Sequence, residues 1–388
     1  MPVTRFATKL TGTAGDDSVD QIDGAELSVD DVTICPCVDD DTFYAFKVDE
    51  SGDTEGPGVI APNTNAGNKR HKLLPAVSSN DNILINQDFA IWQENTTFTN
   101  PATTVYTADG YAVESLAGGG TLPTVNVKKN AVNMDTAFAQ CCELEITNVG
   151  AAGATRTYGL KHCVEDFEKY KGKTLTVSIK IKASVAITLS GGKLYIYDGV
   201  GSGNVAITAV TTGYVIYSAN ITVDDAATEL SVMFYAVAGT SKTISATGSI
   251  YIQWMKLEIG SVATPLVPRK TADELRLCQR YYQKSYAQGT FAGAARTVGE
   301  IILRMEGIAS ADHTAYLDTR FFVVMKSTPT ITLYDEAGTS GKVTMAAGNG
   351  IAGTSGNACD SGFRASGTNG AASTTRKLAY HYTAISRI

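Results

Sequence analysis

The feature that most constrains this chain is an alternation of apolar and polar side chains with a period of two residues. It is strictest at 174–181, where Leu, Val and Ile alternate with Thr, Ser and Lys. Successive side chains of a strand point to opposite faces, so this period predicts a strand with one buried and one wet face. Similar stretches lie at 194–197 and 230–235. Several such strands predict a mainly β protein whose central part is a two-sheet sandwich or jelly roll.

The length and composition divide the chain into several β domains. At 388 residues it exceeds one hydrophobic core of ordinary size, and its 37 Gly and 18 Tyr favour strands and tight turns over helices. We expect a multi-domain protein with a small N-terminal β domain at 1–78, a jelly-roll domain at 79–268, a linking helix at 269–287 and a C-terminal β domain, a second sandwich, at 288–388.

The C-terminal domain has its own pattern. The segments 321–325 and 330–334 are predicted strands, and 378–384 is predicted as the last strand. Between them, 346–375 is rich in Gly, Ala, Ser and Thr, which predicts low-complexity loops.

One helix is predicted, from Thr271 to about Tyr286. Thr271 and Glu274 have the spacing of a capping box, and apolar residues follow at helical spacing. The helix must bury this stripe, either against its own jelly roll or, as we expect, in the interface of a homotrimer. The residues of the stripe are Leu275, Cys278, Tyr281, Tyr282 and Tyr286.

The seven cysteines fit no disulfide framework or zinc spacing, because they are odd in number and scattered. Buried free thiols are one interpretation. The alternative concerns Cys35 and Cys37, which flank a proline and could form a disulfide between neighbouring subunits.

Several function classes are disfavoured. A net charge of −7 argues against nucleic acid as a partner, and the absence of an apolar run of about 20 residues, together with an N-terminus that lacks a signal-peptide core, argues against membrane insertion. The four histidines, His71, His162, His313 and His381, are spread over three predicted domains and share no helical or strand spacing, so we expect no metal, no cofactor and no enzyme. The carboxylate pairs 165–166 and 224–225 leave polysaccharide cleavage as a less favoured alternative.

Aromatic side chains of the predicted jelly roll are candidates for stacking on a sugar ring, although each could instead belong to the core. These candidate glycan-binding residues are Trp92, Trp254, Tyr195, Tyr197 and Tyr217.

Three segments resemble parts of proteins of tailed-phage fibres. Residues 82–93 resemble the opening strand of a jelly-roll module of carbohydrate-binding type, 255–265 resemble its closing strand, and 273–282 resemble the helix that follows it. Residues 59–70 resemble a small N-terminal fibre module, and 327–335 with 380–384 resemble a C-terminal fibre domain. Modules of this type often carry an acidic residue just before the closing strand, and this residue helps to hold calcium. At that place this chain has the non-acidic residues Ile252, Gln253, Trp254 and Met255.

The resemblance implies a structural protein of a bacteriophage virion, made in the host cytoplasm. Its N-terminal domain would dock to other virion proteins, and its later domains would bind a host surface glycan or carry another fibre. Threefold symmetry is implied for most such proteins, and a head decoration or collar fibre is the alternative within the same class.

Overall fold

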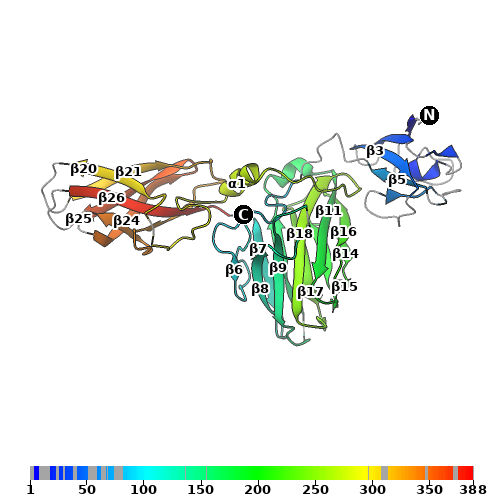
Figure 1. Cartoon of the computed structure of the whole chain (residues 1–388), viewed down its shortest axis with the longest axis horizontal. Coiled ribbons are helices and arrows are strands. Elements are labelled where there is room, and N and C mark those ends of the chain that lie inside the picture. The colour runs from blue at the N-terminus through cyan, green and yellow to red at the C-terminus, as the bar shows by residue number, and fades with distance from the viewer. Residues whose placement is uncertain are drawn as a thin grey trace.

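The computed structural model describes residues 4–7, 18–22, 26–28, 31–37, 42–50, 59–62, 67, 69–73, 82–135, 137–153, 155–295, 297–306, 313–345, 348–369 and 375–387. The chain is mainly β, as predicted. Figure 1 shows three β units in a row, which we call the N-terminal sheet, the sandwich and the C-terminal sheets. Among the described residues, no helix is long and apolar enough to cross a membrane.

The N-terminal sheet has the strand order β1-β2-β3-β5-β4. Its small core contains Val19, Cys35 and Phe46, and Val262, from the end of the sandwich, packs against it. Its elements are β1 (Thr4–Phe6), η1 (Val19–Gln21), β2 (Val32–Cys37), β3 (Thr42–Asp49), β4 (Val59–Ile60) and β5 (Arg70–Leu73).

The sandwich consists of a five-stranded and a six-stranded antiparallel sheet. The five-stranded sheet has the order β14-β13-β17-β10-β7 and the six-stranded sheet the order β16-β11-β18-β9-β8-β6. Their strands are β6 (Thr97–Phe98), β7 (Tyr111–Ala117), β8 (Thr124–Asn130), β9 (Cys141–Asn148), β10 (Arg156–Cys163), β11 (Thr174–Ala183), β13 (Lys193–Tyr197), β14 (Ser202–Ala206), β16 (Val215–Thr222), β17 (Ser231–Gly239) and β18 (Gly248–Ile259). The short pair β12 (Ile187–Thr188) and β15 (Ala209–Val210) and the turn η3 (Phe167–Tyr170) complete the unit.

The chain crosses repeatedly between the two sheets, which gives the sandwich its jelly-roll character. The inward positions of β11 are Leu175, Val177, Ile179 and Ile181, all fully buried in one core shared by both sheets. The period-two pattern therefore predicted this strand and its buried face correctly. The prediction of a wet opposite face is wrong in the middle of the strand, where Thr176 and Ser178 are 1% and 0% exposed.

The predicted opening strand at 82–93 is wrong, because this segment forms bends and turns. Its backbone N–H and C=O groups form hydrogen bonds with side chains rather than with a neighbouring strand. The Asn86 amide donates to the Ile91 and Asp109 carbonyls at 2.8 and 2.9 Å, and Asn86 and Phe89 have φ angles of 52° and 55°. A regular strand excludes such left-handed residues.

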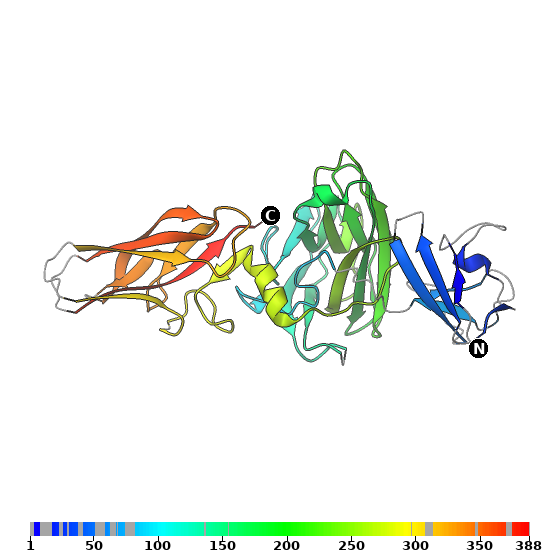
Figure 2. The same cartoon turned by 90° about the horizontal axis from the view of Figure 1, so that it is seen from above.

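The helix is shorter than predicted: α1 covers Thr271–Gln279 and lies between the sandwich and the C-terminal sheets (Figure 2). The chain then enters β19 (Tyr282–Lys284), which pairs with β26 (Thr375–Ile385), so ladder bonds replace further helical turns. The capping box is also wrong. The Glu274 carboxylate accepts from the Asn86 N–H at 2.7 Å and pairs with Arg269 at 2.9 Å.

The C-terminal sheets surround β26, which pairs with β19, β20, β22 and β23. Tyr380, Tyr382 and Phe363 form the centre of their core. The strands are β20 (Ile301–Glu306), β21 (His313–Arg320), β22 (Thr330–Tyr334), β23 (Lys342–Met345), β24 (Gly348–Cys359) and β25 (Gly362–Asn369).

Two predictions for this unit are wrong. Residues 321–325 form a loop instead of a strand, with Phe322 exposed. The low-complexity segment instead contains β24 and β25, which pair with each other. A Cβ atom at Gly353 or Gly367 would come within 2.6 Å of the Val343 side chain, so the missing side chains let these strands pack closely.

Candidate functional site

The outward face of the six-stranded sheet carries polar and aromatic side chains. On β11 these include Ser178 and Lys180, which alternate with the core positions. On β18 the register shifts between Ile252 and Trp254, because Gln253 is an extra residue. This bulge turns Trp254 to the outward face, opposite Lys180, although strict alternation from the buried Ile252 would point it into the core.

A hollow of about 290 Å³ lies on this face. Its floor is the sheet, one wall is the loop between β8 and β9, and the other wall is the segment after β18, residues 260–268, which we call the strap. The lining residues are Ser178, Lys180, Ile216 and Trp254 of the sheet, Ala137 and Phe138 of the loop, and Ala263, Thr264, Pro265, Leu266 and Pro268 of the strap or its end.

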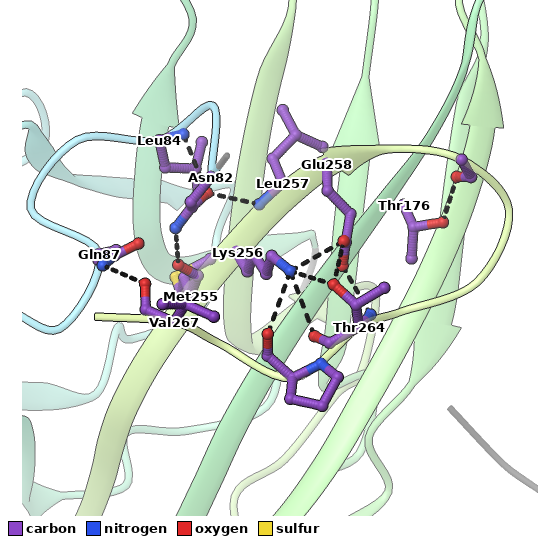
Figure 3. Close-up of polar contacts among 12 residues, drawn as sticks. Asn82, Leu84, Gln87, Thr176, Met255, Lys256, Leu257, Glu258, Thr264 and Val267 are labelled. Carbon is purple, nitrogen blue, oxygen red and sulfur yellow. Dashed lines mark hydrogen bonds and ion pairs between the residues drawn. The ribbon is translucent and has the colours of Figure 1, made fainter. Parts of the chain in front are cut away.

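A buried ion pair fixes the middle of the strap (Figure 3). The Lys256 Nζ and Glu258 Oε2 atoms are 2.8 Å apart, and the two residues are 3% and 0% exposed. Lys256 also donates to the Thr264 hydroxyl and, at 3.3 Å, to the Pro265 carbonyl. The Thr264 N–H donates to Glu258 at 2.8 Å. Burial raises the pKa of Glu258, and the adjacent Lys256 opposes that rise.

The loop wall is held by a separate set of contacts. Its Asp135 carboxylate pairs with Lys180 at 2.5 Å, and its backbone N–H donates to the Gln253 side chain at 2.7 Å. The Tyr214 hydroxyl donates to the Asn133 carbonyl at 2.7 Å, and Lys180 lies over the Tyr214 ring. The bulge residue Gln253 therefore both turns Trp254 outward and anchors the wall opposite the strap.

The floor of the hollow has one unusual polar group. The Ser178 hydroxyl is fully buried and has no hydrogen-bond partner among the residues that the structure describes. A buried hydroxyl without a partner costs about 1–3 kcal/mol. The Ser178 hydroxyl is therefore enclosed beneath the hollow. The Trp254 ring and the Lys180–Asp135 pair are the groups suited to a small ligand that has both an apolar face and hydroxyl groups.

The other predicted glycan-binding residues are not gathered at this hollow. Trp92 is 5% exposed, belongs to the core, and donates its indole N–H to the Phe89 carbonyl at 2.7 Å. Tyr217 packs against the core, and its hydroxyl donates to the Ala209 carbonyl at 3.1 Å. These positions favour the structural interpretation for both residues.

Tyr195 and Tyr197 lie on the outward face of the other, five-stranded sheet. Their rings are 6.1 Å apart and nearly parallel, and Lys193 Nζ lies 4.3 Å from the centre of the Tyr195 ring. Since the three residues alternate along β13, they form a row in which Tyr195 has a neighbour on each side. Tyr235 lies against the same ring, at 6.2 Å.

The predicted interface stripe is largely used within the chain. Cys278, Tyr282 and Tyr286 are 1%, 5% and 2% exposed, and the Tyr286 ring stacks on His381 at 3.9 Å. The Tyr281 hydroxyl donates to Glu165. Only Leu275 and Cys278 of the stripe are helical, because α1 ends before Tyr281, and Leu275 is partly exposed.

The two cysteines predicted to form a disulfide between subunits are only partly described. Cys35 is buried in the N-terminal core, and the side chain of Cys37 lies outside the described residues. The homotrimer and the disulfide stay predictions.

The sandwich and the C-terminal sheets meet in a polar junction. Arg280 binds Glu165 through two bonds of 2.7 and 2.9 Å, which lower the pKa of Glu165. Lys284 donates to the Gln93 carbonyl at 2.7 Å, and Arg387 pairs with Glu94. These contacts commit Glu165, a candidate for polysaccharide cleavage, to holding two units together.

A smaller cavity of about 30 Å³ lies inside this junction, and the His162 ring lines it. Burial lowers the pKa of His162 to about 4. Across the part of the chain that is described, no cluster of three His, Cys, Asp or Glu side chains is arranged to hold a metal ion.

Comparisons with known proteins give only distant likenesses. No family model and no curated protein sequence matches this chain. Among solved structures, the enzymatically active domain of bacteriophage CBA120 tailspike protein 4 is 16% identical over 41% of this chain, with a TM-score of 0.27, and the aligned part spans 21% of that chain. The CBM22-1 xylan-binding domain of Paenibacillus barcinonensis Xyn10C is 14% identical over 49% of this chain and 100% of its own, with a TM-score of 0.28.

A cyclase from Fischerella sp. TAU is 9% identical over 47% of this chain and 98% of its own, with a TM-score of 0.32. Likenesses this distant decide nothing about ligand or activity. The site rests on the geometry of the chain itself.

Proposed function

We propose that this chain is a structural protein of a tailed-phage particle whose sandwich binds a carbohydrate in the hollow beside Trp254. The observation that carries the carbohydrate assignment is the hollow itself. It brings together a tryptophan turned outward by a bulge, the buried and unpartnered hydroxyl of Ser178, and the Lys180–Asp135 pair.

A sugar fits this chemistry better than a charged ligand. Lys180 is already paired with Asp135, so the pair supplies a donor and an acceptor without a large net charge. Sugar rings carry apolar C–H groups that complement an aromatic face, and hydroxyls that can bond to the Lys180–Asp135 pair. The remaining lining is apolar, as in most small-molecule sites.

The particle assignment is supported by the resemblance of segments 82–93, 255–265 and 327–335 to phage fibre proteins. In this proposal the N-terminal sheet docks to other virion proteins, the chain forms a homotrimer, and the sandwich faces a host surface glycan. A head decoration or collar fibre is the alternative, and no catalytic residue is assigned.

The carbohydrate assignment can be tested on an array of bacterial surface polysaccharides and oligosaccharides probed with the purified chain. We expect binding that falls at least about tenfold in Trp254→Leu, equivalent to about 1.4 kcal/mol, and that is unchanged in the matched control Tyr197→Leu on the other sheet. Circular dichroism confirms that both variants are folded. Binding that survives in Trp254→Leu but is lost in Tyr197→Leu would move the site to the five-stranded sheet.

A further inference from the structure

The junction between the sandwich and the C-terminal sheets covers one end of strand β10. Tyr158, Leu160 and His162 alternate along this strand and are all buried, and His162 is the last of them before β10 ends at Cys163. The His162 ring is 4% exposed and lines the cavity of about 30 Å³ together with residues of α1 and the C-terminal sheets. Water can therefore reach this ring only if the junction opens.

The buried ring of His162 lacks polar partners. Neither of its nitrogens has a hydrogen-bond partner among the residues that the structure describes. A Cβ atom at Gly110 would lie 3.0 Å from His162 Nε2, and the Tyr111 ring packs edge-on at 4.9 Å. Burial lowers the pKa of His162 to about 4, and the backbone of Cys163 and Ile85 offsets only part of this effect. The closed junction thus favours a neutral imidazole.

The charged groups that line the cavity are already engaged. The Asp109 carboxylate accepts two hydrogen bonds from Gln93, at 2.6 and 2.9 Å. Glu94 pairs with Arg387, which brings a positive charge from the C-terminal sheets to the same cavity. A proton on His162 would therefore place a second cation in a small enclosed space in which both carboxylates have other partners.

The remaining titratable groups around the cavity do not supply a negative charge in acid. Burial raises the pKa of each, so all of them are neutral when the pH falls. They are Tyr106 and Cys163 of the sandwich, and Cys278, Tyr281 and Tyr282 of α1 and the chain that follows it. Burial also raises the pKa of Asp109, and protonation of Asp109 opposes the effect of His162. Both bonds to Asp109 come from the same unit, so opening the junction leaves them in place.

Polar bonds hold the two units together around this cavity. The Gln93 side chain donates to the Tyr282 carbonyl at 2.9 Å, and Lys284 donates to the Gln93 carbonyl at 2.7 Å. Arg280 adds its two bonds to Glu165. The sandwich is held instead by one apolar core shared by both sheets. Because local opening starts where few apolar contacts must be broken, the junction should open at a lower cost than the sandwich unfolds.

We infer that His162 makes this junction sensitive to acid: protonation of its ring lets α1 and the C-terminal sheets separate from the sandwich while the sandwich stays folded. The inference concerns the conformation of the chain and does not depend on the carbohydrate function proposed above.

The sign of the effect follows from the two states of the ring. In the open junction the His162 pKa returns to its ordinary value of 6.5, whereas it is about 4 in the closed junction. The closed state is therefore fully stable above about pH 6.5 and weakens as the pH falls. Between about pH 7.5 and about pH 5 the equilibrium shifts towards the open state by about 30-fold. Arg280 holds the pKa of Glu165 below its ordinary value of 4.5, so that contact persists over this range.

Two buried cysteines allow the opening to be measured without any label site being added. Cys278 is 1% exposed and lines the junction cavity, and Cys142 is 0% exposed in the sandwich core. The whole chain is treated with dithiodipyridine, which reacts with thiols in acid, and the modification of each cysteine is followed by mass spectrometry. Each rate is divided by the rate for the urea-unfolded chain at the same pH.

We expect the normalised rate of Cys278 to rise at least about tenfold from about pH 7.5 to about pH 5, and to exceed that of Cys142 at least about tenfold at about pH 5. Equal rates for the two thiols would mean that the sandwich unfolds as a whole and would overturn the inference. A Cys278 rate that does not change with pH would overturn it as well.

A variant arm assigns the effect to one ring. His162→Gln should remove the pH dependence of Cys278, and the matched control His313→Gln, on the C-terminal sheets, should retain it. Glu165→Gln removes a charge from the joint, and it should speed the modification of Cys278 several-fold at about pH 7.5 with Cys142 still protected. If Cys142 shows that His162→Gln is unfolded, the comparison of Cys278 with Cys142 in the unmodified chain and in Glu165→Gln decides. A folded His162→Gln with an unchanged pH dependence would assign the opening to another group and contradict the inference.

Discussion

The two outward faces of the sandwich both carry aromatic side chains next to a lysine, but these aromatic rings have different neighbours. On the five-stranded sheet, Tyr195 lies between Lys193 and Tyr197 and touches Tyr235, so the aromatic rings cover one another. On the six-stranded sheet, Trp254 lines a hollow although its side chain is only 4% exposed, and the buried Ser178 hydroxyl beside it has no partner among the described residues.

The difference shows that the number of aromatic residues is a poor guide to a binding face. The Tyr195 ring stacks on Tyr197 and contacts Tyr235 and Lys193, and such cross-strand pairs stabilise the sheet they lie on. Trp254 instead lines a hollow together with Lys180. We therefore place the ligand on the six-stranded face.

The largest expected effect comes from removing a core side chain that packs between the two sheets. Trp92→Ala deletes a core side chain between the sheets and should lower the free energy of unfolding by about 3–5 kcal/mol. Urea unfolding followed by Trp254 fluorescence measures it. A loss under about 1 kcal/mol would mean that Trp92 is not a core residue.

Acid should also lower the free energy of unfolding of the whole sandwich. Burial lowers the pKa of His162 from its ordinary value of 6.5 to about 4, so the unfolded chain binds this proton more readily than the folded chain does. Stability should therefore be complete above about pH 6.5 and fall by about 3 kcal/mol towards pH 4.

Both tryptophans of the chain lie in the sandwich, so their fluorescence reports acid unfolding of that unit alone. His162→Gln is the control and should flatten the pH dependence. An equally steep dependence in His162→Gln would assign the effect to other groups.

A smaller effect distinguishes two hydroxyls on the same face by its sign. Ser178→Ala removes the buried, unpartnered hydroxyl and should raise the free energy of unfolding by about 1 kcal/mol. Thr176→Val, on the same face of the same strand, removes a hydroxyl bonded to Gly260 and should lower the free energy of unfolding by about 1 kcal/mol. If Ser178→Ala destabilises the chain, its hydroxyl has a partner in solution.

The smallest effect is expected on the five-stranded face. Lys193→Met removes the cation from the Tyr195 ring and should cost about 0.5–1 kcal/mol, with sugar binding unchanged. Thermal unfolding with a parallel binding assay measures both quantities. A binding defect in Lys193→Met would contradict the assignment of this face as structural.

Sequence patterns predicted those parts of the fold that obey local rules. The alternation at 174–181 gave β11 and its buried face, and the pattern at 330–334 gave β22. The errors occurred where a distant partner decides the structure. Tyr282 leaves the helical pattern because β26 offers a ladder, and the Gly-rich β24 and β25 form because Val343 fills the space of the missing side chains.

The site could be predicted only in part. Trp254 was singled out as one of several aromatic candidates, but its direction depends on the bulge at Gln253, and no local pattern marks an extra residue in a strand. Ser178 looked like any polar position of an alternating strand, since its lack of a partner is visible only in three dimensions. The pair of prolines after β18 was the one available sign of a rigid wall.

The most direct test uses the fact that the chain has only two tryptophans, one in the core and one in the hollow. Their indole N–H groups give two signals in a nitrogen-correlated NMR spectrum of protein labelled at tryptophan, and Trp254→Phe assigns them. On titration with a sugar that binds, the Trp254 signal should shift and saturate with the binding curve while the Trp92 signal stays fixed. A saturating sugar that leaves the Trp254 signal unmoved would contradict the account.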